Sequence, residues 1–418
     1  MDKDITNLTL NQYLEPINLK KFNDLIEKLG LDKYAKKLTT FKLISLLIFG
    51  QLLAIKSLDY LSLKVINSEN LQRVVKLKSI SASQLSRKLR DLPPTVTYQM
   101  FKHLSQSILI KKGASFVRRN LNQAHLIDAS TISMAVSQYN WADFRETKAG
   151  IKLNLDVVFD GDRTIPNEAV ISPAIEADKT KMNELVITTN PNALYVFDRA
   201  YVDYELFDNY TENHTLFISK LKKNAKVEVI SSSTALVDGK IVKDSIVRLG
   251  SKGTTRMRNN LRLIEIPDDR DPNKIIRIIT NDMERSAQEI GDLYRNRWQI
   301  ELFFKWIKQH LNVQKFHGFS QNAVENQIWI ALITYLLLTL LKERTKTTNT
   351  LLTVQRLLIT CKYDTFEKFI KKINRPPSKI SLGRRKINHD EIFEFTLQQT
   401  LEDDIEHLYS TIYDPLMF

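Results

Sequence analysis

The hydrophobic pattern of the chain changes near residue 120, and this change limits the folds that the sequence can adopt. Up to that point apolar residues recur at helical spacing, as in "YAKKLTTFKLISLLIFGQLLAI" (34–55). Between 124 and 210, strand-like runs such as "AHLIDAS" (124–130) and "IKLNLDVVFDG" (151–161) alternate with short helical segments. This succession predicts an α/β sheet with helical cover.

The part of the chain from 214 to 280 has a third pattern. Several β-rich runs, from "HTLFISKL" (214–221) to "KIIRIITN" (274–281), are parted by turn residues, and helices resume near Ser286. We therefore expect five parts. They are a helical N-terminal domain (1–120), the first part of an α/β core (121–213), a β-rich insertion (214–280), the second part of the core (281–345) and a helical C-terminal region (346–418).

The charge balance limits the classes of partner. A net charge of +13 and a pI near 9.4 favour a polyanion, nucleic acid first. The single Cys361 excludes an internal disulfide framework and fits a reducing cytosol. No signal peptide opens the sequence, and the longest apolar run (328–341) is shorter than the roughly 20 residues that cross a bilayer. We expect a cytoplasmic protein that binds nucleic acid, without a membrane partner.

Two aspartates stand where apolar runs end. Asp128 follows "HLI", and Asp198 follows "LYVF". A carboxylate at the end of a buried strand projects into the crevice beside the sheet, where α/β proteins place their sites. The alternative is that each Asp simply caps the following turn, because turn-forming Asp is common.

A third acid, Glu301, lies in "YRNRWQIELFFKWIK" (294–308). On a single helix at about 100° per residue, Tyr294, Arg297, Glu301 and Lys308 fall within a sector of about 60°. Apolar residues cover most of the remaining surface, so this polar stripe is expected to face a cleft. The alternative is an exposed Arg297–Glu301 ion pair, which would leave the other polar residues without a role.

Three such acids predict a site for phosphoryl transfer. Two divalent ions about 3.5–4 Å apart can activate an attacking oxygen and stabilise the leaving one. Mg²⁺ prefers carboxylate oxygens and keeps several waters, so two or three carboxylates suffice. Arg297 and Lys308 would grip the phosphates, and Arg297 can do so bidentately.

The segment "KSISASQLSRKLRDLPP" (78–94) predicts a short basic helix in the N-terminal domain. Ser81 is its expected N-cap and the two prolines end it. Gln84, Arg87 and Lys88 would lie on its outer side. The helix fits the recognition helix of a helix-turn-helix, although solvated surface helices share this pattern, and both interpretations stay open.

The motif at 294–308 resembles that of the insertion-sequence DDE transposases that carry a Tyr-Arg-Glu-Lys signature. The family pattern is Tyr, two residues, Arg, three residues, Glu, six residues, Lys, and Tyr294, Arg297, Glu301 and Lys308 complete it. The resemblance extends over about residues 30–345.

The family's two aspartates also find matches. Asp128 in "LIDASTI" matches the first, and Asp198 in "DRAY" matches the second. One departure is Asn154 in "IKLNL", which stands where the family often has His.

The resemblance implies a ribonuclease-H-like core, a mixed sheet with flanking helices interrupted by the β-rich insertion, with helical N- and C-terminal regions. Asp128, Asp198 and Glu301 would be the catalytic acids and would hold two Mg²⁺ ions, for which Mn²⁺ can substitute. The implied contacts to DNA are Tyr294, Arg297, Lys308, Trp298, Lys148, Lys152 and Arg199.

The implied reaction is cut-and-paste transposition by a DNA transposase. Water nicks one strand at the end of the element, the freed 3′-hydroxyl forms a hairpin, and the reopened end attacks target DNA, usually within a homodimer holding two ends. Hairpin-forming relatives stack a Trp of the insertion on a flipped base. Residues 214–280 contain no Trp. Phe217 or Trp298 would have to substitute, although packing is the usual role of Trp in so apolar a helix.

Two other functions stay open. A structure-specific DNA nuclease on the same core would cleave without strand transfer. A non-catalytic DNA-binding protein derived from a transposase would have lost at least one of the three acids, and all three are present.

Overall fold

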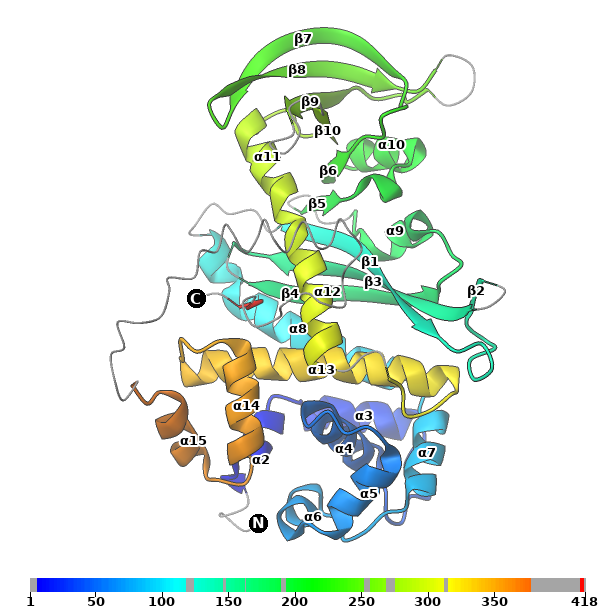
Figure 1. Ribbon diagram of the computed structural model, residues 1–418, viewed down its shortest axis with the longest axis vertical. Helices are drawn as coiled ribbons and strands as arrows, with labels where there is room; N and C mark the ends of the chain where they lie inside the picture. Colours follow the sequence, from blue (N-terminus) through cyan, green and yellow to red (C-terminus); the bar gives the residue numbers. More distant parts are fainter. Residues whose placement is uncertain are drawn as a thin grey trace. The chain divides into compact units, whose positions relative to one another are not determined.

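The computed structural model describes residues 6–117, 124–145, 148–161, 163–188, 193–251, 256–267, 275–311, 315–376 and 414–416. The chain divides into two compact units (Figure 1). The first consists of Met1–Leu104 and Lys305–Phe418, and the second of Ser105–Phe304.

The first unit is helical, as the sequence predicts for residues 1–120. Its helices are α2 (Thr9–Leu14), α3 (Leu19–Lys28), α4 (Thr40–Leu52), α5 (Leu58–Ile66), α6 (Glu69–Val75), α7 (Ala82–Asp91), α13 (Gln321–Thr345), α14 (Leu351–Cys361) and α15 (Phe366–Ile373), with the start of α8 (Pro94–Val117) and the end of α12 (Trp298–His310). Ser81 caps α7 in a capping box with Gln84, as expected. The helix ends at Asp91, and Pro94 begins α8.

Helix α13 forms the centre of the first unit and packs on α2, α4, α7 and α14. At 25 residues it is long and apolar enough to cross a membrane, but 94% of its most apolar stretch is buried. The apolar run 328–341 is itself as short as the sequence indicated, but the helix extends beyond it at both ends, so length alone does not exclude a membrane span. The prediction of a core helix is confirmed.

The second unit is built on one mixed sheet, which has ten strands among the described residues. The strands are β1 (Ala124–Met134), β2 (Asp143–Arg145), β3 (Lys148–Phe159), β4 (Thr164–Pro173), β5 (Leu194–Phe197), β6 (Leu216–Lys220), β7 (Val227–Val237), β8 (Lys240–Leu249), β9 (Leu261–Pro267) and β10 (Ile275–Thr280). Their order is β2-β3-β1-β5-β6-β10-β9-β8-β7, and β4 pairs with β3. The pairs β1–β5 and β5–β6 are parallel, and β1–β3 and β3–β4 are antiparallel. The segment 214–280 thus continues the sheet beyond β5.

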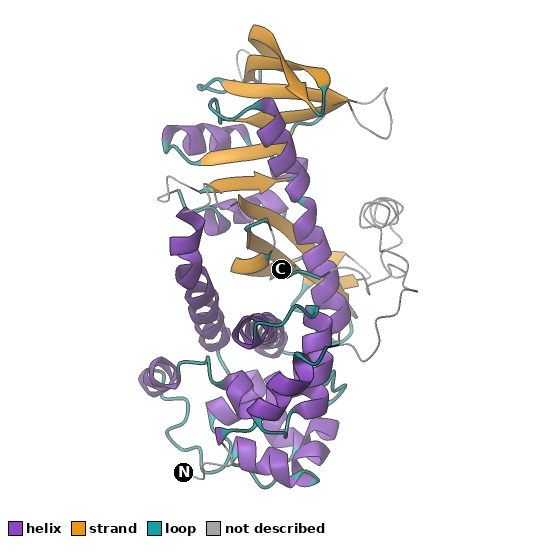
Figure 2. Ribbon diagram, turned by 90° about the vertical axis from the view of Figure 1, so that its left-hand side faces the viewer, coloured by secondary structure: helices purple, strands orange, loops and turns teal. Residues whose placement is uncertain are grey.

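Helices cover both faces of this sheet (Figure 2). One face carries α11 (Ala287–Asn296), which packs on β5, β6 and β7. The other carries α9 (Met182–Leu185) and α10 (Tyr204–Glu212), and two short 3₁₀ turns, η1 (Asp178–Lys181) and η2 (Arg199–Tyr201), precede them.

An aromatic core lies between α10 and the sheet. The rings of Phe207 and Phe217 stack with centroids 4.3 Å apart, and Phe197 stacks on Phe217 at 6.0 Å. Phe217 is fully buried. The suggestion that Phe217 stacks on a flipped base was therefore wrong, because its ring belongs to the core.

The segment 294–308 is two helices rather than the single helix assumed from the sequence. Helix α11 ends at Asn296, Arg297 forms a turn, and α12 begins at Trp298. Bonds with a three-residue step, from Arg297 N–H to the Tyr294 carbonyl and from Ile300 N–H to the Arg297 carbonyl, tighten the chain there.

Candidate active site

The two aspartates lie side by side because of the strand register. Strands β1 and β5 are parallel, and Ile127 pairs with Phe197. The next residues, Asp128 and Asp198, therefore follow at the same level and on the same face. Asp128 lies inside β1, which continues to Met134, so only Asp198 ends its strand, contrary to our expectation for Asp128. The register confirms that the two acids are neighbours.

Arg297 connects Glu301 with Asp128, because its guanidinium group forms ion pairs with both carboxylates. One guanidinium nitrogen of Arg297 lies 2.6 Å from a carboxylate oxygen of Glu301, and another lies 3.8 Å from one of Asp128. The three side chains are 16–23% exposed, so solvent reaches them only in part. The i, i+4 ion pair that the sequence allowed does form, but it is partly buried and shared with Asp128.

The three acids act on one another electrostatically. Burial raises the pKa of Asp128 to about 7; Arg297 opposes this rise, and the charges of Glu301 and Asp198 add to it. Burial also raises the pKa of Glu301, with Arg297 opposing and Asp198 adding. Burial disfavours the charged form of Arg297, yet the acids, Glu301 first, outweigh it and raise its pKa. One cation thus serves three carboxyl groups that repel one another.

Tyr294 completes the part of the predicted stripe that lies in the second unit. It is half-buried, burial raises its pKa, and its side chain hydrogen-bonds to Arg297. Lys308, at the far end of α12, belongs to the first unit, and burial lowers the pKa of its ammonium group.

The donor set fits hard divalent cations in its chemistry. Three carboxyl groups whose repulsion is only partly relieved by one guanidinium favour added positive charge. In the part of the chain that the structure describes, however, no three acid, His or Cys side chains are arranged so that they could hold a metal ion. Arg297 lies between Asp128 and Glu301, so these side chains would have to rearrange around an ion.

The remaining predicted DNA contacts of the second unit differ in exposure. Lys148 and Arg199 are exposed. Lys152 instead pairs with Asp178 at 2.6 Å. Trp298 is 8% exposed, as expected for packing.

On α7, two of the three predicted residues point outward as expected. Gln84 and Arg87 are exposed. Lys88 does not: its ammonium lies 2.6 Å from a carboxylate oxygen of Asp32 and donates to the Leu31 carbonyl at 3.1 Å. Its charge is therefore already neutralised within the first unit.

Sequence reasoning missed Tyr201, the Tyr of the "DRAY" motif. This side chain is 1% exposed, and its hydroxyl finds no hydrogen-bond partner among the described residues. Burial raises its pKa, and the charges of Asp128, Asp178 and Asp198 raise it further. The sequence could have indicated this position, because Tyr201 follows Asp198 by three residues. One 3₁₀ turn over that distance places its side chain near the acids.

Asn154, which replaces the family's His, is part of the sheet's packing. It is fully buried and donates to the Val170 carbonyl and to Ser172 Oγ. It pairs with Ala129, so it lies on the face opposite Asp128.

Comparison with known proteins gives consistent matches. Residues 121–337 match the family described as "Transposase DDE domain", and residues 6–74 match a domain of unknown function (DUF4372). The chain is 31% identical over 270 residues to a "Probable transposase for insertion sequence element IS5377" of Geobacillus stearothermophilus, which covers 63% of this chain and 68% of that protein.

Two further relatives have similar coverage. A "Putative transposase y4zB" of Sinorhizobium fredii is 33% identical over 256 residues, covering 60% of this chain and 69% of the relative. A "Putative transposase for insertion sequence element IS4SA" of Synechocystis sp. is 26% identical over 273 residues, covering 63% of this chain and 71% of the relative.

Proposed function

Because this chain belongs to the DDE transposases of insertion sequences, enzymes that cleave and transfer DNA strands with divalent metal ions, we propose that Asp128, Asp198 and Glu301 are its catalytic acids. They would hold two Mg²⁺ ions, for which Mn²⁺ can substitute. The observation that carries this proposal is the electrostatic coupling of three acids far apart in the chain around one guanidinium.

The residues of this site divide the work. When bound, the ions supply charge that activates the attacking oxygen and stabilises the leaving one. Arg297 releases Glu301 and Asp128 and turns its fork of donors to a DNA phosphate, which it can bind bidentately. Tyr294, which already hydrogen-bonds to Arg297, orients that fork. Lys308, which belongs to the first unit, would contribute a separate contact to DNA.

The fold of this core is ribonuclease-H-like. The strand sequence β4-β3-β1-β5-β6, antiparallel on one side of β1 and parallel on the other, supports this assignment. We propose with it the five parts expected from the sequence: a DNA-binding domain (1–120), a core in two pieces (121–213 and 281–345), an insertion (214–280) and a C-terminal region (346–418). Because β6 (Leu216–Lys220) pairs with β5, this strand would belong to the core, and the insertion would begin after Lys220.

The substrate is the end of an inverted repeat, and the enzyme acts in the bacterial cytoplasm as a homodimer. Cleavage proceeds through nicking, hairpin formation and opening, and strand transfer to target DNA. Helix α7, with Gln84, Arg87 and Lys88, contributes to end binding, as do Lys148, Lys152 and Arg199. Trp298 is buried, so it could contact DNA only after leaving its packed position. For Lys88 and Lys152, the ion pairs with Asp32 and Asp178 would have to open.

Replacement of one acid tests the site. Asp198→Asn should leave binding of a duplex end intact and abolish its cleavage in Mg²⁺. The matched control is Asp292→Asn, which removes a carboxylate from the exposed side of α11, where it pairs with Arg295. Cleavage by Asp198→Asn at the wild-type rate would show that the acids are assigned wrongly.

A joining assay separates the transposase from a nuclease on the same core. A pre-cleaved end with a free 3′-hydroxyl is incubated with a target plasmid and Mg²⁺. We expect covalent end–plasmid products with the wild type and none with Asp198→Asn. Cleavage of intact ends without any joined product would favour the nuclease.

A further inference from the structure

A polar hollow of 390 Å³ lies on the second unit beside the turn that follows Asp198. Its wall is formed by Val202, Tyr204, Lys222, Asn224, Ala225, Lys226, Gly250 and Ser251. Val202 directly follows η2, and η2 directly follows Asp198, so one short stretch of chain connects the hollow with the acids.

Five polar side chains line this hollow. Lys222, Asn224 and Lys226 are exposed, and Tyr204 and Ser251 are partly exposed. Within the described part of the chain, none of these five side chains has an ion pair or a hydrogen bond. The hollow therefore offers two ammonium groups, an amide and two hydroxyls that have no ion pair or hydrogen bond to any residue that the structure describes.

Most cations elsewhere in the second unit differ in this respect. Lys152, Lys181, Arg262 and Arg295 each pair with an acid of the same unit. Two acids of the neighbouring strands also have partners, since Glu228 pairs with Arg256 and Glu265 with Arg277 and Lys243, so these acids do not neutralise the lysines of the hollow. Among the described residues, no acid neutralises the ammonium groups of Lys222 and Lys226.

The loop that carries the lysines is held in place by its backbone. Arg277 donates to the carbonyls of Lys222 and Lys223 at 3.4 and 3.3 Å. The Gly250 N–H donates to the Lys226 carbonyl at 3.0 Å, and Gly250 has φ +91°, which favours glycine. Binding a ligand here would cost little backbone entropy, because the loop is already ordered.

We propose that this hollow binds backbone phosphates of the DNA strand that enters the active site. Lys, Asn, Ser and Tyr side chains are donors that proteins commonly direct at phosphate and sugar oxygens. The proposal rests on the proposed function, because the DNA strand is the anion expected beside Asp198. The contacts are independent of base identity, so the hollow positions DNA and does not read its sequence.

The salt dependence of binding tests this directly. The probe is a duplex of the terminal inverted repeat, read from the DNA that flanks the gene, titrated in EDTA at several salt concentrations. Each lost phosphate contact lowers the slope of log K against log salt by about 0.9. Lys222→Gln/Lys226→Gln should lower it by about 1.8. Between about 50 and 200 mM salt, wild-type affinity should fall roughly tenfold more than that of the variant.

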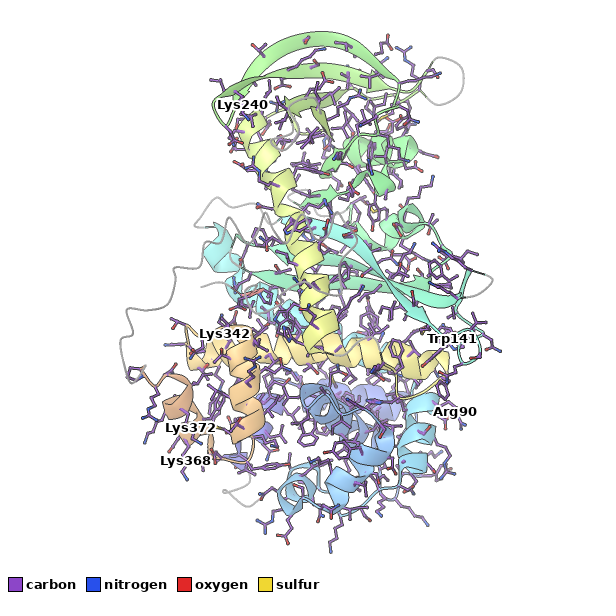
Figure 3. The ribbon with its side chains drawn as sticks, viewed as in Figure 1. Arg90, Trp141, Lys240, Lys342, Lys368 and Lys372 are labelled. Atoms are coloured by element: carbon purple, nitrogen blue, oxygen red, sulfur yellow. The ribbon has the colours of Figure 1, made fainter. Side chains whose placement is uncertain are left out.

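The matched control removes the same charge from the same sheet. Lys240 and Lys243 are exposed and lie toward the opposite end of β8 from Gly250, and Lys240 is labelled in Figure 3. Unlike the lysines of the hollow, Lys243 has an acid nearby, since its ammonium lies 3.7 Å from Glu265. Lys240→Gln/Lys243→Gln should keep the wild-type slope. An unchanged slope in Lys222→Gln/Lys226→Gln, or an equal fall in the control, would overturn the proposal.

A second measurement localises the contact. Hydrogen exchange of the amides in 222–226 and at Gly250 should slow when the duplex is added, and no slowing there would also count against the hollow. Failure of the proposed function has a different signature. Asp198→Asn would then still cleave the duplex, whereas the slope measured in EDTA does not depend on cleavage.

Discussion

Two parts of the ten-stranded sheet, the inner strands β1 and β5 and the strands β7 to β9 at one end, differ in how their acids are paired. At β1 and β5, three acids share the single cation Arg297. At β7 to β9, acids have cations of their own, as in Asp244 with Arg262 and Glu228 with Arg256. An ion pair of one acid with one cation has no net charge and contributes only to the fold. Three partly buried carboxyl groups around one guanidinium instead form a site that favours added positive charge. The number of acids per cation, more than their burial, therefore separates the candidate site from the rest of the sheet.

The largest expected effect breaks the acid surplus itself. Glu301→Gln should lower the rate of end cleavage by about a thousandfold or more, because stabilisation by bound metal is worth several kcal/mol. Cleavage is measured under single-turnover conditions in Mg²⁺. Glu228→Gln, in the paired half of the sheet, should cleave at close to the wild-type rate. Equal losses of cleavage in both variants would remove the distinction between these two parts of the sheet.

The converse experiment breaks a pair. Asp244 and Arg262 are 12% and 11% exposed, and removing Asp244 leaves the guanidinium without its carboxylate. Asp244→Ala should lower the free energy of unfolding by about 3 kcal/mol, measured by urea denaturation, while the folded variant still cleaves. Loss of cleavage without loss of stability would contradict this account.

The pH dependence of stability sharpens the comparison. The pKa of Asp128 is about 7 in the folded protein against 3.8 ordinarily, so the folded state keeps a proton that the unfolded chain releases between these values. Without divalent metal, the unfolding free energy contributed by this group should fall as pH rises from about 4 to about 7. Urea denaturation in EDTA measures the slope. Asp128→Asn should flatten it, and an unchanged slope would exclude Asp128 as its source.

The smallest effect concerns two buried tyrosines. Tyr201 and Tyr210 are 1% and 2% exposed, and neither hydroxyl has a hydrogen-bond partner in the described residues. Since an unsatisfied buried hydroxyl is unfavourable, Tyr201→Phe and Tyr210→Phe should each be neutral or stabilising by about 1 kcal/mol. Thermal unfolding in EDTA measures both. A large destabilisation would reveal a hydrogen bond to a residue outside the described part.

The elements were largely predictable because their signals are local. Hydrophobic spacing located β1, β3, β5 and α10, and Ser81 marked the start of α7. The place of Asp198 after its strand was predictable from the sequence, whereas Asp128 lies inside β1 and not at its end. What joins them is the pairing of Ile127 with Phe197. This long-range register has no local sequence signal.

The failures have physical reasons of the same kind. At Arg297 the backbone hydrogen bonds change from a four-residue to a three-residue step. The sequence has no Pro or Gly there that would have predicted this turn. The burial of Phe217 depends on α10 folding back over β6. The engagement of Lys88 depends on Asp32, which is distant in sequence. Tyr201 was visible in its motif, but only the 3₁₀ turn relates it to the acids.

Because Asp128 is positioned by the pairing of β1 with β5, deletion of a single codon in β1 would harm activity more than many substitutions in that strand. Side chains alternate between the two faces of a strand, so losing one codon between Ala124 and Asp128 would turn that aspartate toward the aromatic core. The strand would keep its apolar composition and could still pair. Copies of the element inactivated in this way would therefore encode a nearly intact protein whose first acid points to the wrong side.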